Sequence, residues 1–229
     1  MPITDKLPPE LLKFQNIAII APHNDDEVLG CFHLMQKLPF STHIKVILVT
    51  CHNTNLTLTN IRRLETLKAL ESIPNIEFEY WDMPDGNVRD ELSKLDQNFI
   101  SLLASSDLVL CPAINDLTAD HIPIAYTALK QVPAKRLIWY RSTWWTFKMR
   151  NADFIVSGSF KEKFLAIKKF KSQKHIKLNR YLLLSCFEHF FYNFSPSSAE
   201  AFLFADEHRL SPSPLNSISL RHLYRMFYW

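Results

Sequence analysis

The stretch "APHNDDEVLG", residues 21–30, decides how this chain is interpreted. It follows a short apolar and β-branched run, Asn16 to Ile20, which predicts a buried strand. It leads into a helical pattern from Val28 to Leu38, with apolar residues on one side. The predicted strand therefore ends by placing one imidazole and three carboxylates in a strand-to-helix turn.

Two interpretations of this turn are open from these residues alone. Carboxylates at a helix N-terminus are stabilised by the helix dipole, which explains Asp25 and Glu27. That capping role explains neither His23 nor the two adjacent aspartates. The spacing His23-x-x-Asp26 can place an imidazole nitrogen and a carboxylate oxygen on one divalent metal, which leaves Asp25 to act as a base.

The length and composition are those of an ordinary globular domain. With 229 residues, 47% of them hydrophobic, we expect a single domain spanning residues 1–229 with a sizeable core. A net charge of +3 does not indicate a nucleic-acid-binding protein. The three glycines form neither a Gly-x-Gly-x-x-Gly pattern nor a P-loop, which argues against a dinucleotide or Walker-type phosphate site.

The cysteines and apolar runs bear on the cellular location. Four cysteines, at positions 31, 51, 111 and 186, lie far apart, and this favours buried reduced thiols over a zinc ribbon. The N-terminal sequence "MPITDKLPPELLKFQ" lacks the apolar stretch of a signal peptide. Apolar runs all fall short of the roughly 18 residues of a transmembrane helix. We therefore expect a cytoplasmic protein with no transmembrane segment.

Strand and helix patterns alternate along the chain. Further strands are predicted at Ile44–Thr50, Ile76–Trp81, Leu108–Cys111 and Leu137–Tyr140. Helices are predicted at Asn60–Leu70, Leu92–Leu103 and Ile122–Gln131. This alternation predicts an α/β domain with a mostly parallel sheet and helices on both faces.

Ligands of such sheets bind at the carboxyl ends of the strands. Four polar segments follow predicted strands there: "APHNDDE", "TCHNTN", "MPDG" and "PAINDLTADH". The last contains Asp116, Asp120 and His121, and His121 can complete a set of three ligands with His23 and Asp26. Three protein ligands with an open fourth position are what a catalytic zinc needs.

Six short motifs, which occur along the chain in the family's order, resemble the LmbE/PIG-L family of zinc-dependent N-deacetylases. "PHNDDEVLG" is similar to the family's His-Pro-Asp-Asp-Glu motif, and "DLTADH" to its second metal motif. The others are "RRLETLKAL" for its Arg-x-x-Glu helix, "MPDG" for its Pro-Asp-Gly turn, "KFLAIKKFKSQ" for its Lys…Ser-Gln helix and "AEAF" for a strand beginning. Together they cover most of the chain.

The resemblance implies a Rossmann-like three-layer α/β fold and one zinc ion (Zn2+) as cofactor. His23, Asp26 and His121 match the zinc ligands, and Asp25 matches the general base that activates the zinc-bound water. Family members remove acetyl groups from N-acetylglucosamine-type sugars on inositol, lipid, nucleotide or small-molecule carriers. The implied activity is hydrolysis of a linear amide, and the implied partner is a small N-acyl sugar or sugar conjugate.

Two further residues match family positions that contact the substrate's sugar or its attached group. These are Arg62 and Asp85. Taken without the resemblance, they are a helix-surface arginine and a turn aspartate. Both interpretations therefore stay open at this point.

The chain departs from the family pattern at two motif positions. Asn24 replaces the usual proline, which loosens the turn but removes no catalytic group. Thr118 replaces a histidine that stabilises the oxyanion or protonates the leaving group. A threonine hydroxyl can donate one hydrogen bond to the substrate but carries no positive charge. The alternative is therefore a metal-binding domain with weakened or lost deacetylase activity.

A nearby imidazole offers a substitute for the one missing at Thr118. His52 lies in the loop after the second predicted strand, where the family commonly has glycine. We hypothesise that it acts as a catalytic residue, bonding the oxyanion or protonating the departing amine. A bystander residue at the rim is the competing interpretation.

Other features have less specific interpretations. A magnesium phosphohydrolase built on Asp25 and Asp26 is disfavoured, because imidazole ligands prefer zinc. Residues 160–177 predict a basic helix that packs one face; phosphate binding or peripheral membrane contact stays open. The same holds for the aromatic and basic tail, residues 221–229. No feature of the sequence indicates an oligomeric state.

Overall fold

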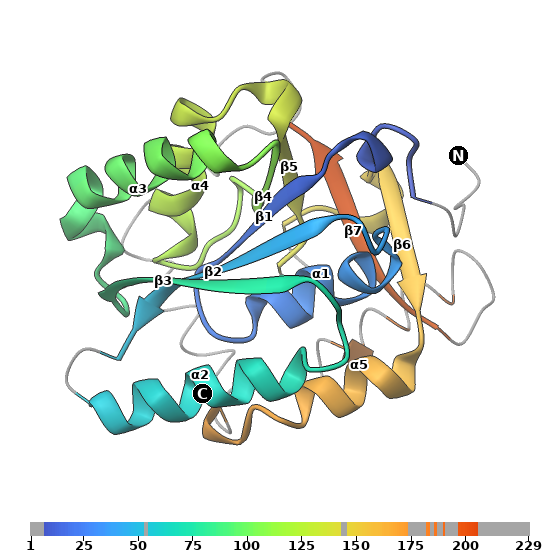
Figure 1. The fold of residues 1–229 in the computed structure, drawn as a ribbon, viewed down its shortest axis with the longest axis horizontal. Helices are drawn as coiled ribbons and strands as arrows, with labels where there is room; N and C mark the ends of the chain where they lie inside the picture. The colour runs from blue at the N-terminus through green and yellow to red at the C-terminus, as the bar shows by residue number, and fades with distance from the viewer. Residues whose placement is uncertain are drawn as a thin grey trace.

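The computed structural model describes residues 7–52, 55–142, 146–173, 182–183, 186, 190 and 197–205. Figure 1 shows these residues as a twisted sheet with helices on both sides. The sheet has seven strands in the order β3-β2-β1-β4-β5-β7-β6. The predicted α/β fold with a mostly parallel sheet is confirmed.

The bounds of the elements are as follows. The strands are β1 Asn16–Ala21, β2 His43–Cys51, β3 Ile76–Pro84, β4 Leu108–Pro112, β5 Leu137–Tyr140, β6 Phe154–Gly158 and β7 Ser198–Phe204. The helices are α1 Asp26–Lys37, α2 Leu56–Ala69, α3 Leu92–Ser105, α4 His121–Gln131 and α5 Phe160–Ile167. Short 3-10 turns are η1 Leu11–Lys13, η2 Val88–Glu91, η3 Ala134–Arg136, η4 Met149–Asn151 and η5 Lys171–Gln173.

Strand direction divides the sheet into two parts. β1 to β5 are mutually parallel wherever they pair. β7 runs antiparallel to both β5 and β6 and joins β6 to the sheet. The sequence pattern assigned no strand to residues 154–158, so β6 is an addition to the predicted order.

The sheet is buried on both faces. Ile17 and Ile19 of β1 belong to a core shared with α1 and α5, whereas Ala18 and Ile20 belong to a core shared with α3 and α4. Figure 1 shows the same division, with α1, α2 and α5 on one side of the sheet and α3 and α4 on the other. A strand buried on both faces explains the continuous apolar run at Asn16–Ala21.

Several element boundaries differ from the predictions for local reasons. Helix α2 begins at Leu56, because the side chain of Asn55 caps it by accepting from the Leu58 N–H at 2.9 Å. β3 continues beyond Trp81 to Pro84, past a register shift and a positive φ of 50° at Asp82.

The predicted basic helix is shorter than expected. Helix α5 ends at Ile167, and the Ser172-Gln173 pair lies in the separate turn η5. The rest of that prediction, residues 174–177, and the tail at 221–229 lie outside the described residues. Among the helices that are described, none has the length and hydropathy of a membrane span.

Candidate metal centre

The carboxyl ends of β1, β2 and β3 are tied together by their backbones. The N–H and hydroxyl of Thr50 donate to the carbonyl of Pro22, just beyond β1, at 3.0 and 2.7 Å. The N–H of Asp85, just beyond β3, donates to the carbonyl of Cys51 at 3.2 Å. His23, next to Pro22, is therefore held at the same edge of the sheet as Asp85.

The turn that follows His23 has an unusual backbone at Asp25. This residue has φ 150° and ψ −23°, a combination that L-residues rarely adopt. Its N–H donates to Glu27 Oε2 at 3.0 Å, and the carbonyl before it, that of Asn24, accepts from Gln173 Nε2 at 2.7 Å. Buried partners thus hold the Asn24–Asp25 peptide on both sides, as a strained functional turn requires.

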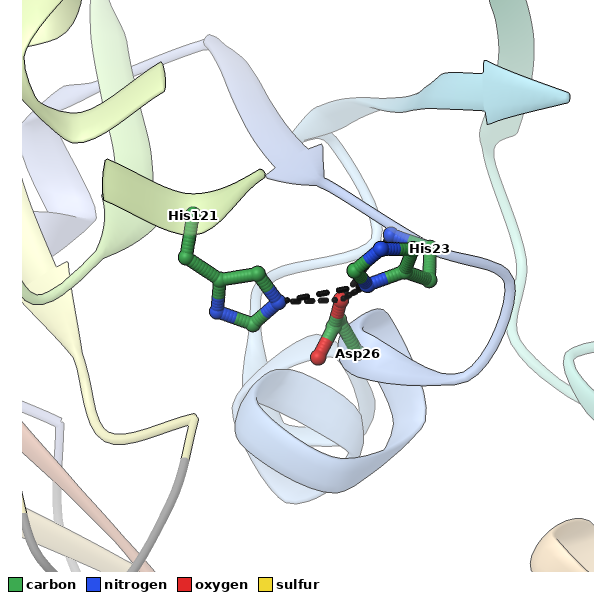
Figure 2. A group of neighbouring side chains, drawn as sticks. All are labelled: His23, Asp26 and His121. Atoms are coloured by element: carbon green, nitrogen blue, oxygen red, sulfur yellow. Dashed lines mark hydrogen bonds and ion pairs between the residues drawn. The ribbon is translucent and has the colours of Figure 1, made fainter. Parts of the chain in front are cut away.

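Three candidate ligand atoms converge beside this turn. Asp26 Oδ2 lies 3.3 Å from His23 Nδ1 and 3.1 Å from His121 Nε2, and the two nitrogens are 3.3 Å apart. Figure 2 shows the two rings and the carboxylate pointing toward one another, from the β1–α1 turn and the start of α4. Two imidazoles and one carboxylate are a donor set that suits zinc and leaves a fourth position for water.

Each imidazole is also bonded on its outer nitrogen. His23 Nε2 lies 3.0 Å from Asp120 Oδ2, and His121 Nδ1 lies 3.0 Å from Asp116 Oδ2. Carboxylates in this position fix the ring orientation and tautomer of metal-binding histidines. His23 Nε2 is also 3.6 Å from Asp85 Oδ1, so Asp85 and Asp120 form a second three-donor group with His23.

The electrostatics of the ligand atoms favour a cation. Burial lowers the pKa of both imidazoles, but the carboxylates of Asp26 and Asp116 raise the pKa of His121 to about 10. Hydrogen bonds to Asp120 and Asp26 likewise raise the pKa of His23 well above its usual value. Although burial opposes it, His121 keeps the pKa of Asp26 far below its ordinary value. A metal bound by these nitrogens therefore displaces protons.

Asp25 has the opposite electrostatic character. Burial, reinforced by the charge of Asp26, raises the pKa of Asp25 well above its ordinary value. A carboxyl group with a raised pKa accepts a proton more readily than an ordinary aspartate. The two adjacent aspartates are therefore tuned in opposite directions, one as an anion and one as a proton acceptor.

The remaining predicted site residues lie around the same edge. Arg62 Nη1 donates to Asp85 Oδ2 at 3.3 Å, so these two form a pair next to His23. His52 follows β2, and its N–H donates to Thr59 Oγ1 at 3.1 Å. The Thr118 N–H and hydroxyl both donate to a neighbouring carboxylate, that of Asp116. The catalytic and substrate-binding roles of these residues stay predictions.

Comparison with known proteins agrees with this geometry. Residues 18–132, half of the chain, match the sequence profile of the family described as PIG-L, GlcNAc-PI de-N-acetylase. The chain belongs to the PIG-L family. The matched residues include the β1–α1 turn and the start of α4, which carry all three candidate ligands. Among curated proteins, none matches the chain significantly.

Solved structures share the PIG-L fold with this chain at low sequence identity. N,N'-diacetylchitobiose deacetylase from Pyrococcus horikoshii is 16% identical with a TM-score of 0.66, over 91% of this chain and 90% of that one. The 4-carboxy-2-hydroxymuconate hydratase GalB from Pseudomonas putida is 13% identical with a TM-score of 0.62, over 86% and 98%. The A40926 pseudoaglycone deacetylase Dbv21 is 19% identical with a TM-score of 0.59, over 84% and 98%.

The sequence pattern assigned no role to several residues that lie around the candidate metal centre in the structure. Asp116 and Asp120 were noticed as loop aspartates, but their pairing with the two histidines depends on ring orientation. Ser142, whose hydroxyl donates to Asp116, follows β5, and the polar residues after that strand were the signal that could have found it. Gln173 ends the motif "KFLAIKKFKSQ", yet its partner Asn24 is distant in sequence.

Proposed function

We propose that this protein is a zinc-dependent amidase that removes an acyl group, typically acetyl, from the amine of an N-acylated sugar or sugar conjugate. The observation that supports it most is the convergence of three ligand atoms, from His23, Asp26 and His121, within 3.3 Å of one another. Two structures that share the fold are described as deacetylases, which agrees with this chemistry without identifying the substrate.

The side chains at the site have distinct tasks in this reaction. His23, Asp26 and His121 would hold a zinc ion, and such an ion would lower the pKa of a water molecule and polarise the amide carbonyl. Asp25 would take a proton from the attacking water and pass it to the departing nitrogen. The carbon–nitrogen bond breaks, the carbonyl carbon gains the water oxygen, and the products are a carboxylate and a free amine.

We propose that the Arg62–Asp85 pair binds the sugar. Asp85 Oδ1 lies 3.6 Å from His23 Nε2, and Arg62 bonds the other oxygen of the same carboxylate. A guanidinium and a carboxylate supply donors and acceptors for sugar hydroxyls. We assign these two residues to substrate binding next to the metal.

A second candidate function is metal binding with weak or no deacetylation. The observation that favours it is that the Thr118 hydroxyl donates to Asp116 Oδ1 at 2.8 Å, so its single proton is already engaged. The fold also occurs in a protein described as a hydratase, so fold alone does not fix the reaction.

One experiment separates the two candidates. Protein purified without chelator is analysed for metal, and amine release is followed over a panel of N-acetylated amino sugars and their conjugates. We expect stoichiometric zinc, together with amine release that Asp25→Asn abolishes. Zinc without release across the panel supports the second candidate. Protein that neither carries zinc nor gains it on titration contradicts both.

A further inference from the structure

Thr118 makes two hydrogen bonds to a buried carboxylate behind the metal centre. Its hydroxyl and its N–H donate to Asp116 Oδ1 at 2.8 and 2.9 Å. The other oxygen, Asp116 Oδ2, accepts from the Ser142 hydroxyl and pairs with His121 Nδ1 at 3.0 Å. Asp116, His121 and Ser142 are all buried.

We propose that Thr118 is a positioning residue of the metal centre: it fixes the Asp116 carboxylate that orients the zinc ligand His121. This assignment rests on the proposed zinc site. Thr118 stands where the family has a histidine that acts on the substrate, and this proposal gives the threonine a different task. Thr118 acts on the metal through Asp116 and His121, and not on the substrate.

The hydrogen-bond inventory of Asp116 supports this role. An ionised carboxylate offers about four acceptor positions, and Thr118, Ser142 and His121 together supply four donors to them. With every position filled, the carboxylate cannot rotate without losing a bond. Asp116 Oδ2 then holds the proton of His121 on Nδ1, which directs the lone pair of Nε2 toward His23 and Asp26.

The other histidine provides an internal comparison. His23 is also backed by a carboxylate, that of Asp120, but Asp120 accepts from the backbone N–H groups of Gly86 and Val88 at 2.7 and 3.3 Å. Backbone donors cannot be removed by a side-chain substitution. The carboxylate behind His121, that of Asp116, is instead held by the side-chain hydroxyls of Thr118 and Ser142. Substituting these side chains therefore tests whether the hydroxyls hold Asp116 in place.

A purely local role for Thr118 is the competing explanation. A bond from the N–H of Thr118 to the side chain of Asp116, two residues earlier, is a common loop-shaping turn. That bond survives replacement of the threonine side chain, whereas the hydroxyl bond does not. Metal affinity therefore distinguishes the two roles, because a loop-shaping role does not require the hydroxyl.

The test is zinc affinity by competition with a chromophoric chelator at fixed pH. Thr118→Val keeps the shape of the side chain and removes its hydroxyl, and we expect zinc affinity to fall about tenfold. Thr118→Ser keeps the hydroxyl and should bind zinc within about twofold of wild type. Asp116→Asn should cost about 10–100-fold, the usual effect of losing a carboxylate behind a metal-bound histidine.

The control is Thr127→Val, which removes a buried hydroxyl from the same helix as His121. It should leave zinc affinity unchanged. Should Thr118→Val fail to fold, Thr118→Ala removes the same hydroxyl without the branched side chain. Wild-type affinity in the folded variant that lacks the hydroxyl overturns the role of Thr118. Wild-type protein that binds no zinc overturns the proposed function, and this role with it, so zinc binding by the wild type distinguishes the two failures.

Discussion

Gln173 donates a hydrogen bond of 2.7 Å from its side-chain amide to the backbone carbonyl of Asn24, 149 residues earlier in the chain. The donor lies in η5, which is itself held by Ser172, whose N–H and hydroxyl donate to Glu65 at 2.9 and 2.6 Å. The acceptor precedes Asp25, whose strained backbone costs about 1–3 kcal/mol. The η5 turn therefore supports the turn that carries the candidate metal site.

Replacing Gln173 should destabilise the protein. Gln173→Met has a similar size but leaves the buried carbonyl of Asn24 without its donor, so we expect a loss of about 1–3 kcal/mol in the free energy of unfolding. Urea denaturation measures this. Gln97→Met, at an exposed position of α3, is the matched control and should change stability by less than about 0.5 kcal/mol. Equal stability of the two variants would contradict the role of Gln173.

The two adjacent aspartates should respond differently to the same substitution. Asp25→Asn removes the proton acceptor and keeps the shape, so it should retain zinc and lose most turnover, by about 10²–10⁴-fold. Asp26→Asn should instead weaken zinc binding, because Asp26 Oδ2 lies between both imidazoles. Metal content and amine release are measured on both variants. Equal loss of metal would show that the two roles are wrongly assigned.

The parallel part of the sheet could be predicted from the sequence because its signals are local. Buried parallel strands are continuous apolar runs, and Ile44–Thr50 and Leu108–Cys111 are recognisable without knowledge of their neighbours. β6 was missed because its apolar run, Phe154 to Val156, is only three residues long and is followed by Ser and Gly. Its place in the sheet depends on pairing with β7, whose residues lie 40 to 48 positions later in the chain.

The convergence of the candidate ligands could be predicted from the sequence, whereas the carboxylates that contact them could not. His23 and Asp26 share one turn, and strand order alone brings the loop of His121 to the same edge. The proton arrangement of His121 depends on which nitrogen faces Asp116, which spacing in the sequence does not encode. The position of Thr118 in the sequence likewise does not reveal whether its hydroxyl faces the substrate or the carboxylate of Asp116.

Breaking the buried ion pair between Lys163 and Glu200, next to α1, should lower the free energy of unfolding. Lys163 Nζ lies 2.6 Å from Glu200 Oε1 and donates to the carbonyl of Leu29 at 2.7 Å. Lys163→Met removes the positive charge and leaves the buried Glu200 carboxylate with only the backbone N–H groups of His33 and Leu34 as donors, so we expect a loss of about 3 kcal/mol. Lys161→Met, exposed on the same helix, is the control for urea unfolding. Similar midpoints for both variants would show that the pair contributes little.

His33 should make stability depend on pH. Burial lowers the pKa of His33 to about 4, whereas an unfolded histidine titrates near 6.5. Between these values the unfolded state takes up a proton that the folded state does not. This contribution to stability is therefore present above pH 6.5 and lost as the pH falls to 4, by about 3 kcal/mol.

The pH effect is isolated by comparing variants. Between pH 6.5 and 4, the free energy of unfolding of His33→Gln should fall less than that of wild type. Urea denaturation at several pH values measures this. His43→Gln removes an exposed histidine from the start of β2 and serves as the control for losing any imidazole. Parallel pH curves for His33→Gln and wild type would contradict the prediction.

His52 is the residue whose catalytic role is most open to test. It follows β2 at the edge where the Thr50–Pro22 and Asp85–Cys51 bonds tie the loops of the site together. If His52 bonds the oxyanion or protonates the departing amine, His52→Ala should lower turnover about a hundredfold, since losing one such donor costs about 3 kcal/mol. Zinc content should not change, because His52 is not among the grouped ligand atoms of the described residues.

The control is His43→Ala, which removes an imidazole from the other end of β2 and should leave both turnover and zinc content unchanged. Wild-type turnover in His52→Ala would make His52 a bystander at the rim, and the oxyanion would then have no imidazole from this loop.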